Sequence, residues 1–111
     1  MCSIAGMIDL RRDVRDLDLT EMKESMRSRG PDQSGQYRDA SAALFHNRLC
    51  VIDPENGLQP MLLREGGRTS VLVYNGELYN TPELRAELRT LGHTFTGHSD
   101  TEVLLHAWRQ W

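Results

Sequence analysis

The stretch SVLVYNGE, residues 70–77, is the clearest structural signal in the sequence. Its first part, residues 70–74, is apolar and rich in β-branched residues, which predicts a strand. Asn75 and Gly76 follow directly, and this pair is typical of a tight type I′ hairpin turn. The same pair also suits chemistry, because the Gly76 N–H and the Asn75 side-chain amide are two donors of the kind that form an oxyanion hole. Both interpretations stay open on these residues alone.

Further strands and helices are predicted on either side of this stretch. β-leaning apolar runs occur at residues 4–9, 42–46, 48–52, 70–74 and 93–95. Helices are predicted at residues 18–30, 81–92 and from residue 99 onward, with turn-rich loops at residues 29–35 and 53–60. Asp18 is placed as a helix cap, Thr81 and Pro82 as a helix start, and Gly92 as a helix end. The sequence SDTE at residues 99–102 is a capping box for the last helix.

This order of elements favours the α+β class. Strands occur in neighbouring runs, so we expect largely antiparallel sheets with helices packed on them. The predicted strands are too few to complete a sheet sandwich, and a helix carrying Trp108 and Trp111 reaches the last residue. We therefore expect a truncated domain that belongs to a longer protein.

Composition excludes several classes of protein. The chain has 111 residues, 39% hydrophobic and 26% charged, which is ordinary for one globular domain and disfavours disorder. Its net charge of -3 argues against a nucleic-acid or anionic-membrane binder. No apolar run approaches the ~20 residues of a membrane span, and no secretory signal begins the chain. Two cysteines make no disulfide scaffold, so we expect a reducing, cytoplasmic location.

Cys2 stands directly after the initiator methionine. A small second residue permits removal of Met1, which leaves Cys2 with a free α-amine. Such an amine titrates at ~7.7–8.0, low enough to accept a thiol proton at physiological pH. One residue would then supply both nucleophile and base. The plainer interpretation is that a cysteine at this position is incidental.

Two further positions carry charges suited to an amino acid. Arg48 offers a planar fork that can bind a carboxylate with two hydrogen bonds. Asp100, at the start of a predicted helix, could hold an ammonium group. The helix dipole at this position favours the ionised form of its carboxyl group. Each has a plainer interpretation, as a strand-end arginine and as part of a helix cap. The histidines form no zinc pattern with the cysteines and no glycine-rich phosphate loop is present, so we predict neither a metal nor a nucleotide site.

Taken together, several segments match one protein family in order and at plausible spacing. They are CSIAG (2–6), RGPD (29–32), HNRL (46–49), VID (51–53), QP (59–60), YNGELYN (74–80) and SDTE (99–102). On these motifs the chain resembles the glutaminase domain of the class II, N-terminal-nucleophile glutamine amidotransferases, and among them the glutamine-hydrolysing asparagine synthetases. The resemblance covers residues 1–111 but only the N-terminal part of that domain, without its later strands or the synthetase domain. It implies an N-terminal-nucleophile hydrolase fold, with antiparallel sheets sandwiched by helices (αββα).

The resemblance also implies which residues are catalytic. Cys2 would be the nucleophile, with its freed amine as the base. Asn75 and Gly76 would form the oxyanion hole that holds the tetrahedral intermediate. Cys50 departs from the family, which more often has a serine there, and its simplest interpretation is a small buried apolar residue.

Substrate-binding roles follow from the same resemblance. Arg48 would hold the α-carboxylate of glutamine, and Asp100 with Glu77 would hold its α-ammonium. The backbone of Val51 and Ile52 would line the pocket.

The implied reaction converts glutamine to glutamate and ammonia through a glutamyl thioester. The ammonia would pass to an ATP-dependent synthetase domain of the same parent chain, which amidates aspartate. ATP and Mg²⁺ are implied for that missing domain, and no cofactor for this segment. A homodimer is compatible with the family. Three alternatives remain: a related amidotransferase with another carboxylate acceptor, a catalytically silent glutamine-binding or regulatory domain, and a plain structural module with coincidental motifs.

Overall fold

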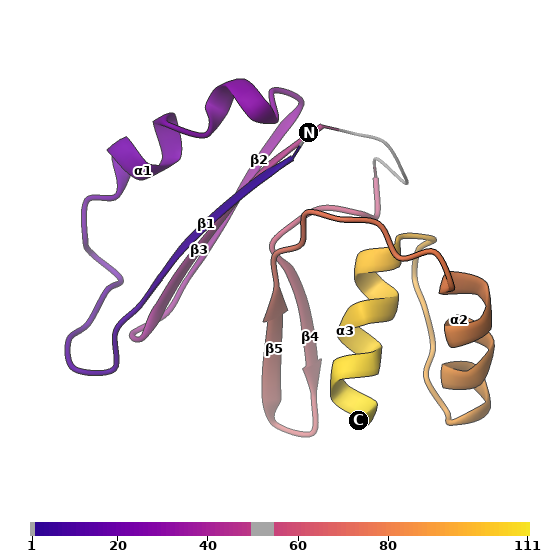
Figure 1. The fold of residues 1–111 in the computed structure, drawn as a ribbon. Helices are drawn as coiled ribbons and strands as arrows, with labels where there is room; N and C mark the ends of the chain where they lie inside the picture. The colour runs from indigo at the N-terminus through magenta and orange to yellow at the C-terminus, as the bar shows by residue number, and fades with distance from the viewer. Residues whose placement is uncertain (1, 50–54) are drawn as a thin grey trace.

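The structure, a computed structural model, describes residues 2–49 and 55–111 and contains two antiparallel sheets with helices packed on them (Figure 1). The strands are β1 (Ser3–Ile8), β2 (Gln33–Arg38), β3 (Ala42–Arg48), β4 (Met61–Glu65) and β5 (Arg68–Leu72). The helices are α1 (Thr20–Glu24), the 3₁₀ helix η1 (Arg27–Arg29), α2 (Thr81–Thr90) and α3 (Asp100–Gln110). The α+β class and the antiparallel pairing are confirmed, and the arrangement is compatible with an N-terminal-nucleophile hydrolase domain.

The first sheet has the strand order β1-β3-β2, with every pair antiparallel. The prediction of two strands at residues 42–46 and 48–52 was wrong within the described residues, because β3 runs unbroken through Asn47. Asn47 pairs with Ser3 on one side and Ser34 on the other, so pairing on both edges overrides its low strand propensity. The first half of β2, residues 33–35, was predicted as part of a loop because these residues are polar and turn-like, and no element was predicted for residues 36–38.

One face of this sheet carries the first core. Val14, Met26, Ala43 and Phe45 are buried there, and α1 packs against them. The helix predicted at residues 18–30 is broken into α1 and η1. The Ser25 hydroxyl donates to the Met22 carbonyl at 2.8 Å, and the Met26 N–H bonds to Lys23 instead, so the α-helical ladder stops there.

β4 and β5 form a hairpin that the sequence analysis did not predict. Glu65 pairs with Arg68 across a two-residue turn, Gly66-Gly67, in which φ is 58° and 73°. Positive φ at both central positions is the type I′ geometry that matches strand twist. The strand predicted at residues 70–74 is therefore displaced, since β5 ends at Leu72.

The C-terminal helices follow their sequence signals. α2 carries Pro82 in its first turn and ends before Gly92, and Ser99 caps α3 by accepting a hydrogen bond from the Glu102 N–H at 3.3 Å. α3 packs on the β4–β5 hairpin and against α2 (Figure 1). The strand predicted at residues 93–95 is absent, because Phe95 instead lies under the guanidinium groups of Arg85 and Arg89.

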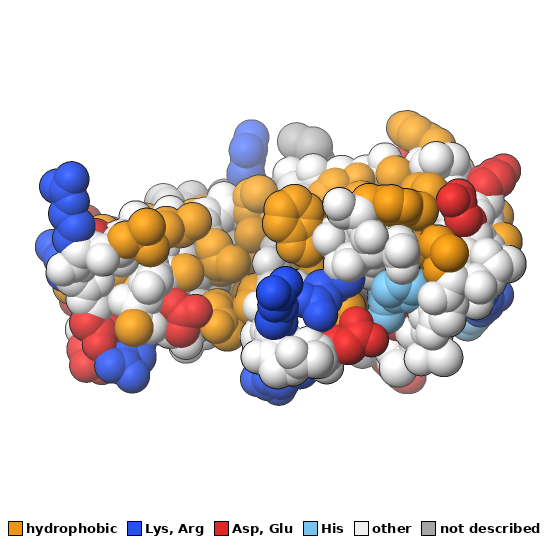
Figure 2. Space-filling view, turned by 90° about the horizontal axis from the view of Figure 1, so that it is seen from below, with side chains coloured by type: hydrophobic (Ala, Val, Ile, Leu, Met, Phe, Trp, Pro, Cys, Tyr) orange, Lys and Arg blue, Asp and Glu red, His pale blue; other side chains and the backbone are white. Residues whose placement is uncertain are grey.

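The two sheets and the helices leave much apolar surface uncovered. Hydrophobic side chains gather along the face seen from below, which is turned away from the N-terminus in Figure 1 (Figure 2). The large hydrophobic residues with the greatest exposure are Ile8, Leu10, Tyr79, Trp108 and Trp111. Among the helices of the described residues, none has the length and apolar character needed to cross a membrane.

Candidate active site

The predicted site residues of the described chain line a single cavity of about 360 Å³. They are Cys2, Arg48, Asn75, Gly76, Glu77 and Asp100. The other lining residues are Leu49, Gly57, Gln59, Tyr74, Ser99 and Thr101. Val51 and Ile52 were also predicted to line the pocket, but they lie outside the described residues, as does Met1.

Segments far apart in the sequence meet at this cavity because of how the strands are directed. The start of β1, the end of β3, the chain that leaves β5 and the start of α3 lie towards the middle of Figure 1, where the first sheet approaches the β4–β5 hairpin and α3. The register that pairs Ser3 with Asn47 brings Cys2 beside the end of β3. There the Leu49 N–H donates to the Cys2 Sγ at 3.4 Å, and the thiol contacts the Leu49 carbonyl at 3.6 Å.

Arg48 is the last residue of β3, and only 6% of it is exposed. Its Nη1 donates to Gln33 Oε1 at 3.0 Å, and its carbonyl accepts from the Asp32 N–H at 3.1 Å. Asp32 of the RGPD motif therefore holds the main chain of Arg48, and Gln33, the residue after the motif, holds its guanidinium. A guanidinium placed in a cavity wall in this way suits a carboxylate ligand.

The Asn75–Gly76 segment does not form the hairpin turn. β5 ends at Leu72, and the chain runs on to α2 without another paired strand. The left-handed glycines of the described chain are elsewhere, so the type I′ interpretation is wrong for this pair. Asn75 and Gly76 instead follow Tyr74 along the cavity wall, where both are exposed to it.

The backbone of Tyr74 is held from both sides. Its N–H donates to Gln59 Oε1 at 2.6 Å, and its carbonyl lies 3.2 Å from His46 Nε2. Burial lowers the pKa of His46, so the ring is neutral near pH 7, and we assign its proton to Nε2, the atom that faces the carbonyl. Sequence reasoning assigned no role to Gln59 or His46, although both lie in motifs of the resemblance.

Two acidic residues, Asp100 and Glu77, also line the cavity. Asp100 is the first residue of α3, and its Oδ2 accepts from the Leu78 N–H at 3.0 Å. Burial raises the pKa of the Tyr74 phenol, and the negative charges of Asp100 and Glu77 raise it further. Arg48 and this acidic pair thus place charges of opposite sign on one cavity, an arrangement that suits an amino-acid zwitterion.

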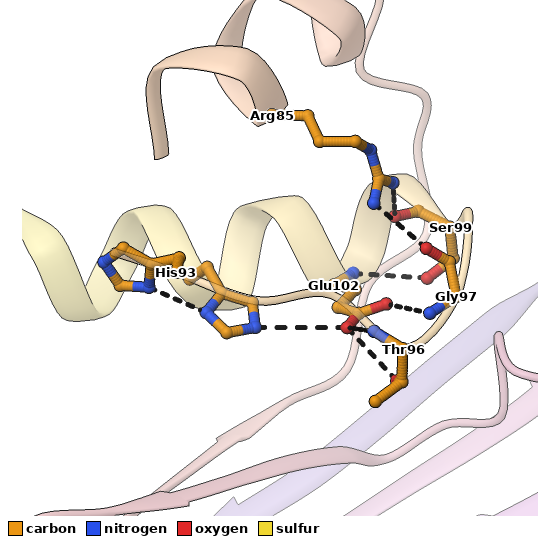
Figure 3. Close-up of polar contacts among 7 residues, drawn as sticks. Arg85, His93, Thr96, Gly97, Ser99 and Glu102 are labelled. Carbon is orange, nitrogen blue, oxygen red and sulfur yellow. Dashed lines mark hydrogen bonds and ion pairs between the residues drawn. The ribbon is translucent and has the colours of Figure 1, made fainter. Parts of the chain in front are cut away.

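The loop before Asp100 is tied down by side chains (Figure 3). The Glu102 carboxylate accepts hydrogen bonds from the N–H groups of Thr96 and Gly97 at 2.7 and 2.9 Å. Arg85 donates to the carbonyls of Gly97 and Ser99 at 3.0 and 3.3 Å. Only half of the predicted capping box forms, because Glu102 reaches back past Ser99 to the loop. The contacts hold the chain that leads into Asp100.

The residues that the structure describes were also searched for a metal site. No group of three or more His, Cys, Asp or Glu residues in them is arranged to hold a metal ion. The Nδ1 atoms of His93 and His106 lie 2.9 Å apart, and neither residue lines the cavity that holds Cys2.

Comparison with known proteins points to one family. Residues 1–111 match the family model described as a glutamine amidotransferase domain. Glutamine-hydrolysing asparagine synthetase 3 of Bacillus subtilis is 42% identical over 113 residues, which cover 100% of this chain and 18% of that protein. Asparagine synthetase B of Escherichia coli is 41% identical over 112 residues, covering 99% of this chain and 20% of that protein. Asparagine synthetase 1 of Arabidopsis thaliana is 37% identical over 113 residues, covering 100% and 19%. The chain spans about a fifth of the length of these relatives.

Proposed function

Since this chain belongs to the glutamine amidotransferase domain family, we propose that it hydrolyses the side-chain amide of glutamine through Cys2 and supplies the ammonia to an acceptor site elsewhere in its parent protein. The observation that carries the proposal is the convergence of Cys2, Arg48, Asn75–Gly76 and Asp100 on one cavity. The names of the relatives favour aspartate as the acceptor and asparagine as the product.

Substrate binding uses the positive and negative charges that line the cavity. Arg48 binds the α-carboxylate of glutamine, and Asp100 with Glu77 binds the α-ammonium. The side chain of glutamine then extends towards Cys2.

The chemical step begins once Met1 is removed. The α-amine of Cys2 takes the thiol proton, and Sγ forms a bond to the amide carbon of glutamine. The carbonyl π electrons move to oxygen, and the side-chain amide of Asn75 and the N–H of Gly76 donate to that oxyanion. When the carbonyl re-forms, the C–N bond breaks and its nitrogen leaves as ammonia with the proton held by the amine. Water then attacks the thioester, which releases glutamate and restores the thiol.

The acceptor half-reaction lies outside this chain. In the proposal, ATP and Mg²⁺ would supply the activation of the acceptor carboxylate in another part of the parent protein, where the released ammonia would be used. The residues of this chain take no part in that step.

The test uses the full-length protein that carries this chain. We expect glutamate release from glutamine, and mass spectrometry should show that the chain begins at Cys2. Cys2→Ala should abolish glutamate release while added ammonia still supports product formation from aspartate. Undiminished glutaminase activity in Cys2→Ala would refute the mechanism. Glutamine binding without turnover in the wild type would instead support a silent binding domain, and ammonia-dependent amidation of another carboxylate would change the acceptor.

A further inference from the structure

We propose that Gln59 is a positioning residue that sets the Asn75–Gly76 donors against the Asp100 end of the cavity. The inference rests on the proposed function and deepens it. Gln59 lines the cavity itself, and no role for it follows from the reaction described above.

The side-chain amide of Gln59 bridges two parts of the site. Its Oε1 accepts from the Tyr74 N–H at 2.6 Å, and its Nε2 donates to Thr101 Oγ1 at 3.2 Å. Tyr74 immediately precedes Asn75, and Thr101 immediately follows Asp100. One planar group therefore links the oxyanion side of the cavity to the ammonium side. A side chain with both an acceptor and a donor at this length is needed to make both bonds.

The backbone of Gln59 is itself fixed against the first sheet. A Cβ at Gly35 of β2 would lie 1.9 Å from the Gln59 carbonyl oxygen and 3.0 Å from Pro60 Cδ. β4 then begins at Met61. The residue thus lies where the two sheets meet, and its amide extends from a main chain that has little room to move.

Without Gln59, the backbone of Tyr74 would lose one of the two side-chain hydrogen bonds that hold it. Its carbonyl would keep His46, but its N–H would lose the partner at 2.6 Å. Asn75 and Gly76 follow directly, so their donors would shift relative to the oxyanion. That charge is absent from bound glutamine and develops in the transition state and the tetrahedral intermediate, so the loss should appear in kcat rather than in KM.

The experiment compares Gln59→Met, which keeps length and removes both hydrogen bonds, with Gln36→Met as a matched control. Gln36 is an exposed glutamine of β2 whose amide contacts Lys23 on the surface. The full-length protein is used, and kcat is expressed per active site labelled on Cys2 by a chloroketone analogue of glutamine. We expect Gln59→Met to lower kcat about 10- to 100-fold with KM for glutamine within about threefold, and Gln36→Met to resemble the wild type. Thr101→Val should show a smaller loss of kcat, which Thr101→Ser restores.

Hydrogen exchange supplies a readout independent of activity. The Tyr74 amide should exchange faster in Gln59→Met than in the wild type or in Gln36→Met. Unchanged kcat per labelled site, a loss confined to KM, or unchanged exchange at Tyr74 would each overturn the positioning role. If the wild type neither hydrolyses glutamine nor reacts at Cys2, the proposed function fails, and the exchange at Tyr74 still decides whether Gln59 holds this segment.

Discussion

Glu102 Oε1 accepts a hydrogen bond from the Thr96 N–H at 2.7 Å, across the loop that leads into α3 (Figure 3). The other carboxylate oxygen accepts from the Gly97 N–H at 2.9 Å. Both hydrogen bonds require a side chain with two acceptor atoms, which the carboxylate provides. Glu102 is only 6% exposed, so water cannot easily replace it as the partner of these N–H groups. The carboxylate therefore fixes the position of the loop before Asp100.

Glu102→Gln should disturb this loop, because an amide presents N–H₂ to one of the two backbone donors. A buried donor left without a partner costs about 1–3 kcal/mol. We expect faster hydrogen exchange at Thr96 and Gly97 and a higher KM for glutamine, because Asp100 loses its support. Glu87→Gln, at an exposed glutamate of α2, is the control. Wild-type KM and exchange in Glu102→Gln would show that the carboxylate does not position Asp100.

Stability should fall as the pH is lowered through the range of histidine titration. The pKa of His106 is lowered first by burial and then by His93, while Glu102 and Glu65 oppose the shift and Arg85 adds to it. Because the folded pKa lies below the unfolded one, the unfolded chain binds more protons at acid pH. The stability contribution is therefore complete above the unfolded value of ~6.5 and is lost as the pH falls through the folded pKa.

The measurement is the exchange protection of α3 amides, corrected for intrinsic rates, at about pH 7.5 and about pH 5.5. Protection should drop more in the wild type than in His106→Gln, which removes the titrating group. Gln36→Met, at an exposed residue of β2 that does not titrate, should retain the wild-type pH dependence. An equal drop in His106→Gln would assign the effect to other groups, such as His46, whose pKa burial also lowers.

Elements with local signals were predictable, and elements defined by pairing were not. α2 and α3 carry their own start signals in Pro82 and Ser99, and both were found in the structure as predicted. β2 was missed because its residues are polar and it becomes a strand only by pairing with β3. A hairpin turn was one of two interpretations of Asn75–Gly76, whereas the two-residue turn that joins β4 to β5 lies at Gly66–Gly67, where glycine tolerates positive φ.

The residues of the candidate site were likewise predictable where a local motif marked them and were missed where only long-range contacts define their role. Motifs identified Cys2, Arg48 and Asp100, because each lies in a short characteristic segment, and the structure brings them to one cavity. Gln59 and His46 were in motifs too, but their contacts with Tyr74 span 15 and 28 positions of sequence. Contacts at such separations depend on how the two sheets meet, which periodicity and capping signals do not encode.

Gly30 does not line the cavity, but Gly30→Ala should displace the end of β3, which carries Arg48. A Cβ at Gly30 would lie 2.3 Å from the carbonyl carbon and oxygen of Asn47 and 2.6 Å from the Arg48 nitrogen. The end of β3 would have to shift, at a cost of typically about 1–3 kcal/mol for an overpacked position. We expect a lower temperature for the loss of glutaminase activity and a raised KM for glutamine. Ser28→Ala, an exposed position nearby in η1, should change neither. A Gly30→Ala protein with wild-type KM would show that Arg48 does not depend on this close approach.

Arg48 should determine the preference for substrates that carry an α-carboxylate. Arg48→Lys keeps the positive charge but loses the planar fork, and a charged hydrogen bond contributes about 1.5–3 kcal/mol, so KM for glutamine should rise roughly 10- to 100-fold. The change in kcat should be smaller, because the α-carboxylate is bound equally in the ground and transition states. 4-Aminobutanamide, which keeps the amide and the amine but lacks the carboxylate, separates this contact from general damage. The wild type should prefer glutamine strongly over 4-aminobutanamide, and Arg48→Lys should lose most of that preference while reacting with 4-aminobutanamide as the wild type does. An undiminished preference in Arg48→Lys would place the α-carboxylate on another residue.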